Sequence, residues 1–144
     1  MSPAVARLAR TAELMGTVFS AHVIGTPSDP PQVESAIASC FAHLSELEAV
    51  FSPFRTSSDI HRLRTGAARL EDLDPRVSAV ADACRAVEAA TAGRFSAWRD
   101  GWFDPTGYVK GWAADVAAQR WLVPLLTMPG VTAVGLNAGG DVRV

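Results

Sequence analysis

The chain has 144 residues, 49% of them hydrophobic, so it is long enough to form one domain with its own core. Its net charge of −2, without any polybasic tract, argues against nucleic acid or an anionic membrane surface as a main partner. Residues 1–14 contain neither the continuous apolar stretch of a secretory signal nor a lipidation cysteine, so we expect a cytoplasmic protein.

The first predicted strand spans residues 15–24, where apolar and polar side chains alternate. One face would carry Phe19, Ala21 and Val23. The opposite face would carry Ser20 and His22, which places His22 on an exposed or half-buried surface. Gly25 follows and closes the strand.

Two amphipathic helices are predicted next. Asp29-Pro30 opens the first, whose apolar residues recur at helical spacing as far as Phe51. Ser57 or Ser58 then caps a short helical turn that reaches Gly66. Asp74-Pro75 opens the second long helix, which Gly93 ends.

The two cysteines, Cys40 and Cys84, each lie within a helical apolar pattern, and the sequence has no C-x-x-C pair. We therefore expect buried, reduced thiols rather than a metal or redox site. Trp98 and Trp102 belong either to the core or to the edge of a ligand site, and the core is favoured because tryptophan is buried more often than it binds a ligand.

The C-terminal third begins with a predicted helix over residues 112–123, which must stop or kink at Pro124. Residues 131–136 form a short apolar strand, and 137–141 form a glycine turn of hairpin type before another strand begins at Val142. Long helices between strands at both ends favour an α+β fold in which two or three helices pack on an antiparallel sheet.

The densest chemistry lies in residues 103–115, which combine Asp104, Lys110 and two glycines directly before the predicted helix. A carboxylate accepts hydrogen bonds, a lysine is a point positive charge, and glycines allow a ligand to approach the backbone. The amides at the start of a helix favour an anion such as phosphate. Asp-Pro-Thr-Gly is also ordinary turn chemistry, so the pattern alone leaves a phosphate site and a solvated turn both open.

The same segment, read as Asp104-Pro-Thr-Gly-Tyr-Val-Lys-Gly-Trp-Ala, resembles the D-x-x-G-x-x-K-G-x-A signature of the FAD:protein FMN transferases, the ApbE family. Further blocks resemble the family in the same order along the chain: Met15-Gly-Thr, Phe51-Ser-Pro-Phe with Ser58-Asp-Ile, and Asn137-Ala-Gly-Gly-Asp. Each block is weak alone, but together they span nearly the whole chain.

The resemblance implies a flavin transferase (T-fold-like) architecture over residues 1–144, treated as a single domain. It implies transfer of FMN from FAD to a serine or threonine hydroxyl of a target flavoprotein, with Mg²⁺ and release of AMP. Physically this is phosphoryl transfer, which depends on positioning and on charge neutralisation. The resemblance supplies no catalytic base, and it names neither the acceptor protein nor the oligomeric state, so homo-oligomer formation is left open.

Site residues follow from the resemblance, position by position. The positions that contact FAD correspond here to Met15, Phe54, Arg94, Phe95, Ser96, Asp104 and Lys110. The glycine-rich turn corresponds to Asn137, Gly139, Gly140 and Asp141. Gly107 matches the residue that offers a ligand to magnesium, which a glycine supplies through its carbonyl oxygen. Ser96 replaces an acid of the family pattern, and Arg64 stands where the family often has asparagine.

The resemblance also implies that this chain corresponds to the N-terminal portion of such a domain. The aspartate and threonine that complete the family's metal site would lie beyond Val144. We therefore expect these 144 residues alone to bind FAD weakly, to show little magnesium dependence and to transfer no FMN. Two alternatives stay open: a flavin-binding module or fragment without activity, and an FAD pyrophosphatase in which water replaces the acceptor hydroxyl.

Overall fold

The computed structural model describes residues 6–139 and 141–143. Its contacts divide the chain into two compact units. The sheet unit comprises residues 1–45 and 111–144, and the helical unit comprises residues 46–110. The expectation that 1–144 form a single domain stays a prediction.

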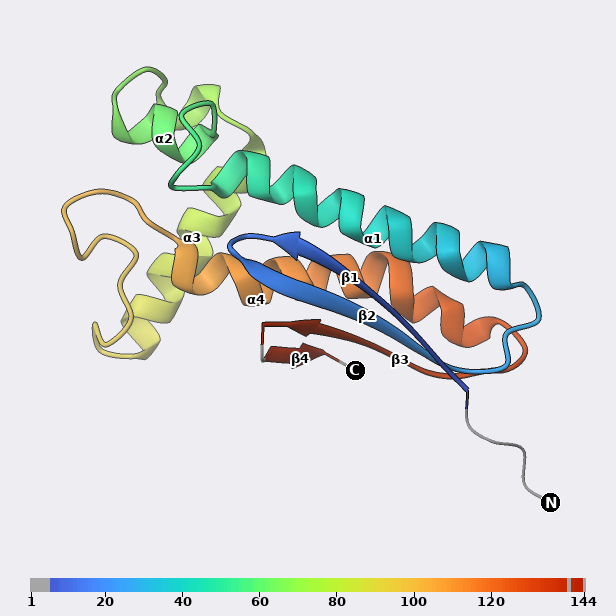
Figure 1. Ribbon diagram of the computed structural model, residues 1–144. Helices are drawn as coiled ribbons and strands as arrows, with labels where there is room; N and C mark the ends of the chain where they lie inside the picture. Colours follow the sequence, from blue (N-terminus) through green and yellow to red (C-terminus); the bar gives the residue numbers. More distant parts are fainter. Residues whose placement is uncertain (1–5, 140, 144) are drawn as a thin grey trace. The chain divides into compact units, whose positions relative to one another are not determined.

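In the sheet unit, the described residues form four antiparallel strands in the order β1-β2-β3-β4, which Figure 1 labels. Their bounds are β1 Arg7–Leu14, β2 Thr17–Gly25, β3 Val131–Ala138 and β4 Asp141–Arg143. This confirms the predicted α+β class with an antiparallel sheet. The sequence did not indicate β1, because most of its side chains are polar or small and exposed. Such charged side chains are typical of an edge strand, which they protect from pairing with another chain.

One face of the sheet is buried, as the alternation in β2 predicted. Phe19, Ala21 and Val23 are almost completely buried, and Leu136 of β3 is buried with them. His22 lies on the other face and is half-buried, as expected. The buried face therefore packs against helical segments of the sheet unit, and the face that carries His22 is left partly open.

Helix α1 spans Pro30–Phe51, which confirms the first predicted helix. Its start is capped by the Asp29 carboxylate, whose Oδ1 accepts a hydrogen bond from the Gln32 amide at 3.2 Å. The apolar stripe is buried along the helix: Val33, Ile37, Cys40, Leu44, Leu47 and Phe51. No helix among the described residues is long and apolar enough to cross a membrane.

The helical unit holds α2 (Asp59–Arg64), the short 3₁₀ turn η1 (Leu70–Asp72) and α3 (Pro75–Ala90). Ser58 caps α2 by accepting a hydrogen bond from the His61 amide at 3.1 Å. Asp74 caps α3 in the same way through the Arg76 amide at 2.9 Å. Both helices thus begin where the sequence predicted.

Helix α4 differs from its prediction, because it spans Thr106–Ala117 rather than beginning at residue 112. Asp104 Oδ1 accepts the Thr106 amide at 3.1 Å, and the Pro105 carbonyl accepts the Val109 amide at 2.9 Å. The Asp-Pro-Thr-Gly segment therefore starts the helix instead of forming a turn before it. As a consequence, Gly107 and Lys110 lie inside α4.

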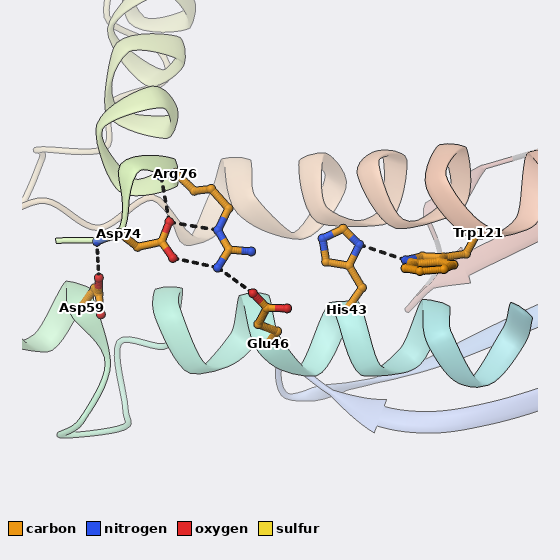
Figure 2. Close-up of polar contacts among 6 residues, drawn as sticks. All are labelled: His43, Glu46, Asp59, Asp74, Arg76 and Trp121. Atoms are coloured by element: carbon orange, nitrogen blue, oxygen red, sulfur yellow. Dashed lines mark hydrogen bonds and ion pairs between the residues drawn. The ribbon is translucent and has the colours of Figure 1, made fainter. Parts of the chain in front are cut away.

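The helical run continues past α4 with altered geometry. Residues 118–122 form the π-helical η2, Ala118–Leu122, and the 3₁₀ turn η3 follows as Val123–Thr127. The expected break at Pro124 is present, since the chain has left α-helical geometry before the proline ring is reached. In the sheet unit, the indole of Trp121 donates a hydrogen bond to His43 Nδ1 of α1 at 3.2 Å (Figure 2).

Candidate functional site

The predicted site residues fall into two groups, one in each unit. The sheet unit carries Met15 and residues 137–141. Strand β3 continues to Ala138 and β4 begins at Asp141, so the turn between them is shorter than the predicted turn over 137–141. The helical unit carries Phe54, the segment 94–96, Asp104, Gly107 and Lys110. Within the sheet unit Gly139 lies against Thr17, and within the helical unit Gly107 lies against Phe95.

In the sheet unit, the β1–β2 turn meets the end of β3. Met15 and Gly16 both have positive φ, 53° and 74°, as a tight hairpin turn requires. The Gly139 amide donates to the Val18 carbonyl at 3.2 Å. A Cβ at Gly139 would lie 2.2 Å from Thr17 Oγ1, so only glycine allows this close approach.

The first and last sequence blocks of the resemblance therefore lie at the same end of the sheet. Asn137 is the penultimate residue of β3 and pairs with Ser20 of β2 in the strand register. Gly140 lies outside the described residues. Asp141 opens β4, pairing with Ala138, and its side chain is also outside the description.

The open face of the sheet carries a hydrogen-bonded row that the sequence did not reveal. Arg7 Nη2 and Nε lie 2.8 and 3.1 Å from His22 Nδ1, and His22 Nε2 lies 2.9 Å from Ser20 Oγ. Because arginine only donates, Nδ1 must accept, and Nε2 then carries the proton donated to Ser20. Burial, followed by the positive charge of Arg7, lowers the pKa of His22. His22 is thus arranged as a neutral donor, not as a base for the Ser20 hydroxyl.

In the helical unit, the start of α4 lies beside the segment that precedes it. The Asp104 amide donates to the Ala97 carbonyl at 2.7 Å. A Cβ at Gly107 would lie 3.5 Å from Phe95 Cε2, so the phenyl ring faces the first turn of the helix. That distance is an ordinary contact and does not itself require glycine. Phe95 therefore lies beside Gly107, and Asp104 is tied to the segment that carries Phe95 through Ala97.

The Arg94-Phe95-Ser96 segment is held by local hydrogen bonds. The Phe95 amide donates to Thr91 Oγ1 at 3.1 Å, and Ser96 Oγ accepts the Trp98 amide at 3.2 Å. The Arg94 carbonyl accepts a hydrogen bond from Arg99 at 2.7 Å. Ser96 therefore fixes a turn at the position where the family pattern has an acid.

Solvent exposure separates the aromatic residues that the sequence singled out. Phe54 is 90% exposed, in a turn whose amides bond to Ser52 Oγ. Trp102 is 46% exposed, so the expectation of a core position is wrong for it. Trp98 is half-buried and stacks on Phe103, with ring centroids 5.1 Å apart. Exposed aromatic rings of this size present apolar surface that a flat ligand would cover.

The magnesium ligands can be tested against the donors present. The described residues contain no cluster of three or more histidine, cysteine, aspartate or glutamate side chains suited to a metal. Beside the start of α4 the donors are the Gly107 carbonyl and the Asp104 carboxylate. Magnesium commonly combines one or two carboxylates with ligand phosphates and water, so a metal at this place would have to be held jointly with a phosphate and not by these donors alone.

Arg64 has no role that could be inferred from the sequence pattern. Its guanidinium lies over the Trp102 ring, 4.8 Å from the centroid. Its Nε and Nη2 atoms are buried and have no hydrogen-bond partner among the described residues. The only sequence indication was the arginine at a position where the resembling family often has asparagine.

Comparison with solved structures shows the fold. The flavin transferase ApbE from Vibrio cholerae matches with a TM-score of 0.76 and 14% identity as its H257G mutant, over 96% of this chain and 62% of that chain. A second structure of that protein gives 0.74 and 14%, covering 97% and 59%. The apo flavinyl transferase ApbE from Pseudomonas stutzeri gives 0.71 and 16%, covering 96% and 60%.

This chain therefore has a flavin transferase fold and spans about 60% of the length of these structures. No protein-family model matches the sequence, and no curated protein resembles it significantly.

Proposed function

We propose that this chain binds FAD and serves in the transfer of FMN from FAD to a serine or threonine hydroxyl of a target flavoprotein. The observation that carries the proposal is the start of α4. There the D-x-x-G-x-x-K-G-x-A segment begins a helix. The Asp104 carboxylate accepts the amide of Thr106, the first helical residue, and the Phe95 ring faces Gly107. The shared flavin transferase fold supports the same conclusion.

The binding roles follow from side-chain chemistry. Lys110 and the N-terminal end of α4 would attract the diphosphate of FAD, because both present positive charge to an anion. Phe54 and Phe95 would provide aromatic surface for a flat ring. Met15 would offer a soft apolar contact at the β1–β2 turn. Asn137 and the glycine-rich turn would shape the backbone close to the ligand.

The proposed chemistry is a displacement at phosphorus. The acceptor hydroxyl oxygen bonds to the FMN phosphorus, the bond from that phosphorus to the bridging oxygen breaks, and AMP leaves with the electron pair. The hydroxyl proton passes to a base that we do not assign. This chain's part is to hold the diphosphate and the flavin in position. Magnesium, when bound, would neutralise phosphate charge, with the Gly107 carbonyl as one ligand.

The proposal is tested by incubating the protein with FAD, MgCl₂ and a serine- or threonine-containing acceptor peptide. FAD binding is followed by flavin fluorescence and the peptide is weighed by mass spectrometry. FMN attached to the peptide, with release of AMP, supports the transferase. FMN and AMP released without a change in the peptide would instead indicate a pyrophosphatase. FAD binding without any cleavage would fit either a flavin-binding module or the N-terminal portion of a longer transferase, and the same assay on a chain extended beyond Val144 separates these two.

A matched pair of variants makes the assay specific. Asp104→Asn removes the carboxylate charge beside the start of α4, and we expect it to weaken FAD binding or transfer. Asp100→Asn removes an exposed carboxylate four residues earlier in the chain and should leave both unchanged. Equal behaviour of the two variants would contradict a role for Asp104. An absence of FAD binding by the unsubstituted chain would contradict the proposed function.

A further inference from the structure

Arg64 and Trp102 form a pair within the helical unit, outside the set of residues that the family resemblance assigns. Arg64 is the last residue of α2, and Trp102 lies two residues before Asp104. The guanidinium carbon stands 4.8 Å from the centre of the indole ring. The indole itself is 46% exposed, so it covers the arginine on one side and meets solvent on the other.

Two of the hydrogen-bond donor atoms of the Arg64 guanidinium have no acceptor among the described residues. Arginine remains charged and has five N–H donors, and buried donors in folded proteins almost always have partners. Nε and Nη2 of Arg64 are buried and have none among the described residues. The cation–π contact with Trp102 does not supply an oxygen or nitrogen acceptor for these N–H groups, because the indole nitrogen only donates.

The positions of Nε and Nη2 on the guanidinium indicate which kind of acceptor would suit them. Nε and Nη2 lie on one edge of the guanidinium and point in nearly the same direction, which suits two oxygens of one phosphate or carboxylate. By contrast, the neighbouring Arg62 on α2 is exposed and lies 3.9 Å from the Asp59 carboxylate. Arg64 is thus the arginine on α2 whose paired Nε and Nη2 donors have no acceptor among the described residues.

We propose that the Nε–Nη2 edge of Arg64 binds a phosphate group and that Trp102 is the movable cover of this site. The two nitrogen atoms are shielded from solvent, so binding would require a neighbouring group to shift, and the proposal assigns that movement to the partly exposed indole of Trp102. The loop that carries Trp102 includes Gly101, whose φ is 86°, so its backbone conformation depends on glycine. If the proposed function holds, the phosphate belongs to the diphosphate of FAD; the site itself requires only the shared phosphate chemistry.

The test uses inorganic pyrophosphate as the probe. Arg64→Gln keeps polar bulk but removes the charge and the paired donors, while Arg62→Gln removes an exposed charge from the same helix. Calorimetric titration should show pyrophosphate binding weakened by on the order of 10- to 100-fold in Arg64→Gln. It should be unchanged in Arg62→Gln. Arg64→Lys should lie between, because lysine keeps the charge without the fork.

Trp102 supplies a second readout. Pyrophosphate should change the tryptophan fluorescence of the unsubstituted protein, and Trp102→Phe should abolish that change while calorimetry still detects binding. Circular dichroism confirms that each variant is folded. If Arg64 only packs on Trp102, Arg64→Gln will alter the melting temperature but not the affinity for pyrophosphate. That result, or no pyrophosphate binding by the unsubstituted protein at millimolar concentration, overturns the proposal.

Parallel titrations with FAD and riboflavin separate this inference from the proposed function. Arg64-dependent binding of pyrophosphate without any FAD binding would uphold the phosphate site and reject the flavin function. FAD binding that is insensitive to Arg64→Gln, together with no pyrophosphate binding, would reject the phosphate site and leave the flavin function standing. Loss of pyrophosphate and FAD binding in Arg64→Gln, with riboflavin unaffected, would place the FAD diphosphate at Arg64.

Discussion

Lys110 is the sole lysine of the chain and lies in the second turn of α4, half-buried. If it contacts the FAD diphosphate, Lys110→Ala should weaken FAD binding by about 1.5–3 kcal/mol, because a charge-assisted hydrogen bond is lost. Riboflavin, which has no phosphate, should bind as before. Calorimetric titration of both ligands checks this, with the exposed Arg120→Ala of the sheet unit as control. An equal loss for both ligands would reject the phosphate role.

Asp74 combines a helix cap with an ion pair (Figure 2). Its carboxylate accepts the Arg76 amide, and Arg76 Nη2 lies 2.7 Å from Oδ2 and 2.9 Å from Glu46 Oε1. The Asp74 amide donates to Asp59 Oδ2 at 2.8 Å. Hydrogen bonds from the Arg76 side chain are the main cause that lowers the pKa of Asp74 from its usual 3.8.

These contacts predict a pH-dependent stability. Because the folded pKa is depressed, the ionised Asp74 stabilises the fold above the unfolded pKa, near 3.8, and this contribution is lost as the pH falls through the lower folded value. Asp74→Asn keeps the cap but loses the charge, so it should be less stable at pH 7, with the difference shrinking below pH 3.8. Asp74→Ala should lose about 1 kcal/mol more through the missing cap.

Urea unfolding at several pH values measures this effect. Asp82→Asn is the matched control, because Asp82 forms an exposed pair with Arg85 on the same helix at 3.1 Å. Exposed pairs of this kind contribute little, so its stability should barely change. A pH-independent difference between Asp74→Asn and the unsubstituted protein would show that the ion pair does not stabilise the fold.

At the scale of elements, the turn into β3 depends on Gly130. Its φ is 90°, and a Cβ there would lie 1.8 Å from the Thr26 carbonyl oxygen, a backbone atom. The two residues are also held together by a hydrogen bond, which the Thr26 amide donates to the Gly130 carbonyl at 2.8 Å. Gly130→Ala should therefore destabilise the protein by roughly 3 kcal/mol or more, through strain and a clash that backbone atoms cannot relieve.

Gly66 offers a matched comparison for that prediction. Its φ is 77°, but a Cβ there would meet nothing within 4 Å. Gly66→Ala should cost only the left-handed backbone penalty, about 1–2 kcal/mol. Thermal or urea unfolding of both variants decides the matter. Similar losses would mean that the close approach at Gly130 does not add to the backbone strain.

At the scale of the whole molecule, each unit holds one cysteine. Cys40 lies in the sheet unit and Cys84 in the helical unit, and both are buried, free thiols, as expected. Burial raises the pKa of Cys40 to about 12 and that of Cys84 to about 11. Each thiol should therefore react slowly with a thiol reagent until its own unit opens.

The reactivity of the two thiols therefore measures whether the sheet unit and the helical unit unfold together. If residues 1–144 form a single domain, both cysteines should become reactive at the same urea concentration, in one transition. Mass spectrometry of the modified peptides follows each site separately. Two separated transitions would show that the sheet unit and the helical unit unfold independently, and would reject the single-domain prediction.

The sequence by itself determined the features that depend on neighbours along the chain. The sequence predicts the start of α1 at Pro30 and the cap of α3 at Asp74, because a cap and an N1 proline act within one helical turn. The buried alternation in β2 was readable from its period of two. The D-x-x-G-x-x-K-G-x-A segment likewise indicated the flavin transferase fold, because all its residues lie close together along the chain.

Only the tertiary structure decided the features that depend on residues far apart. Strand β1 exists because β2 provides its partner, not because its own sequence alternates. The meeting of Gly139 with Thr17 joins residues more than a hundred positions apart, which no local pattern encodes. Likewise, the exposure of Trp102 and the unpartnered donors of Arg64 follow from what the fold places around them. Burial and hydrogen-bond satisfaction are properties of packed neighbours, and the chain acquires those neighbours only on folding.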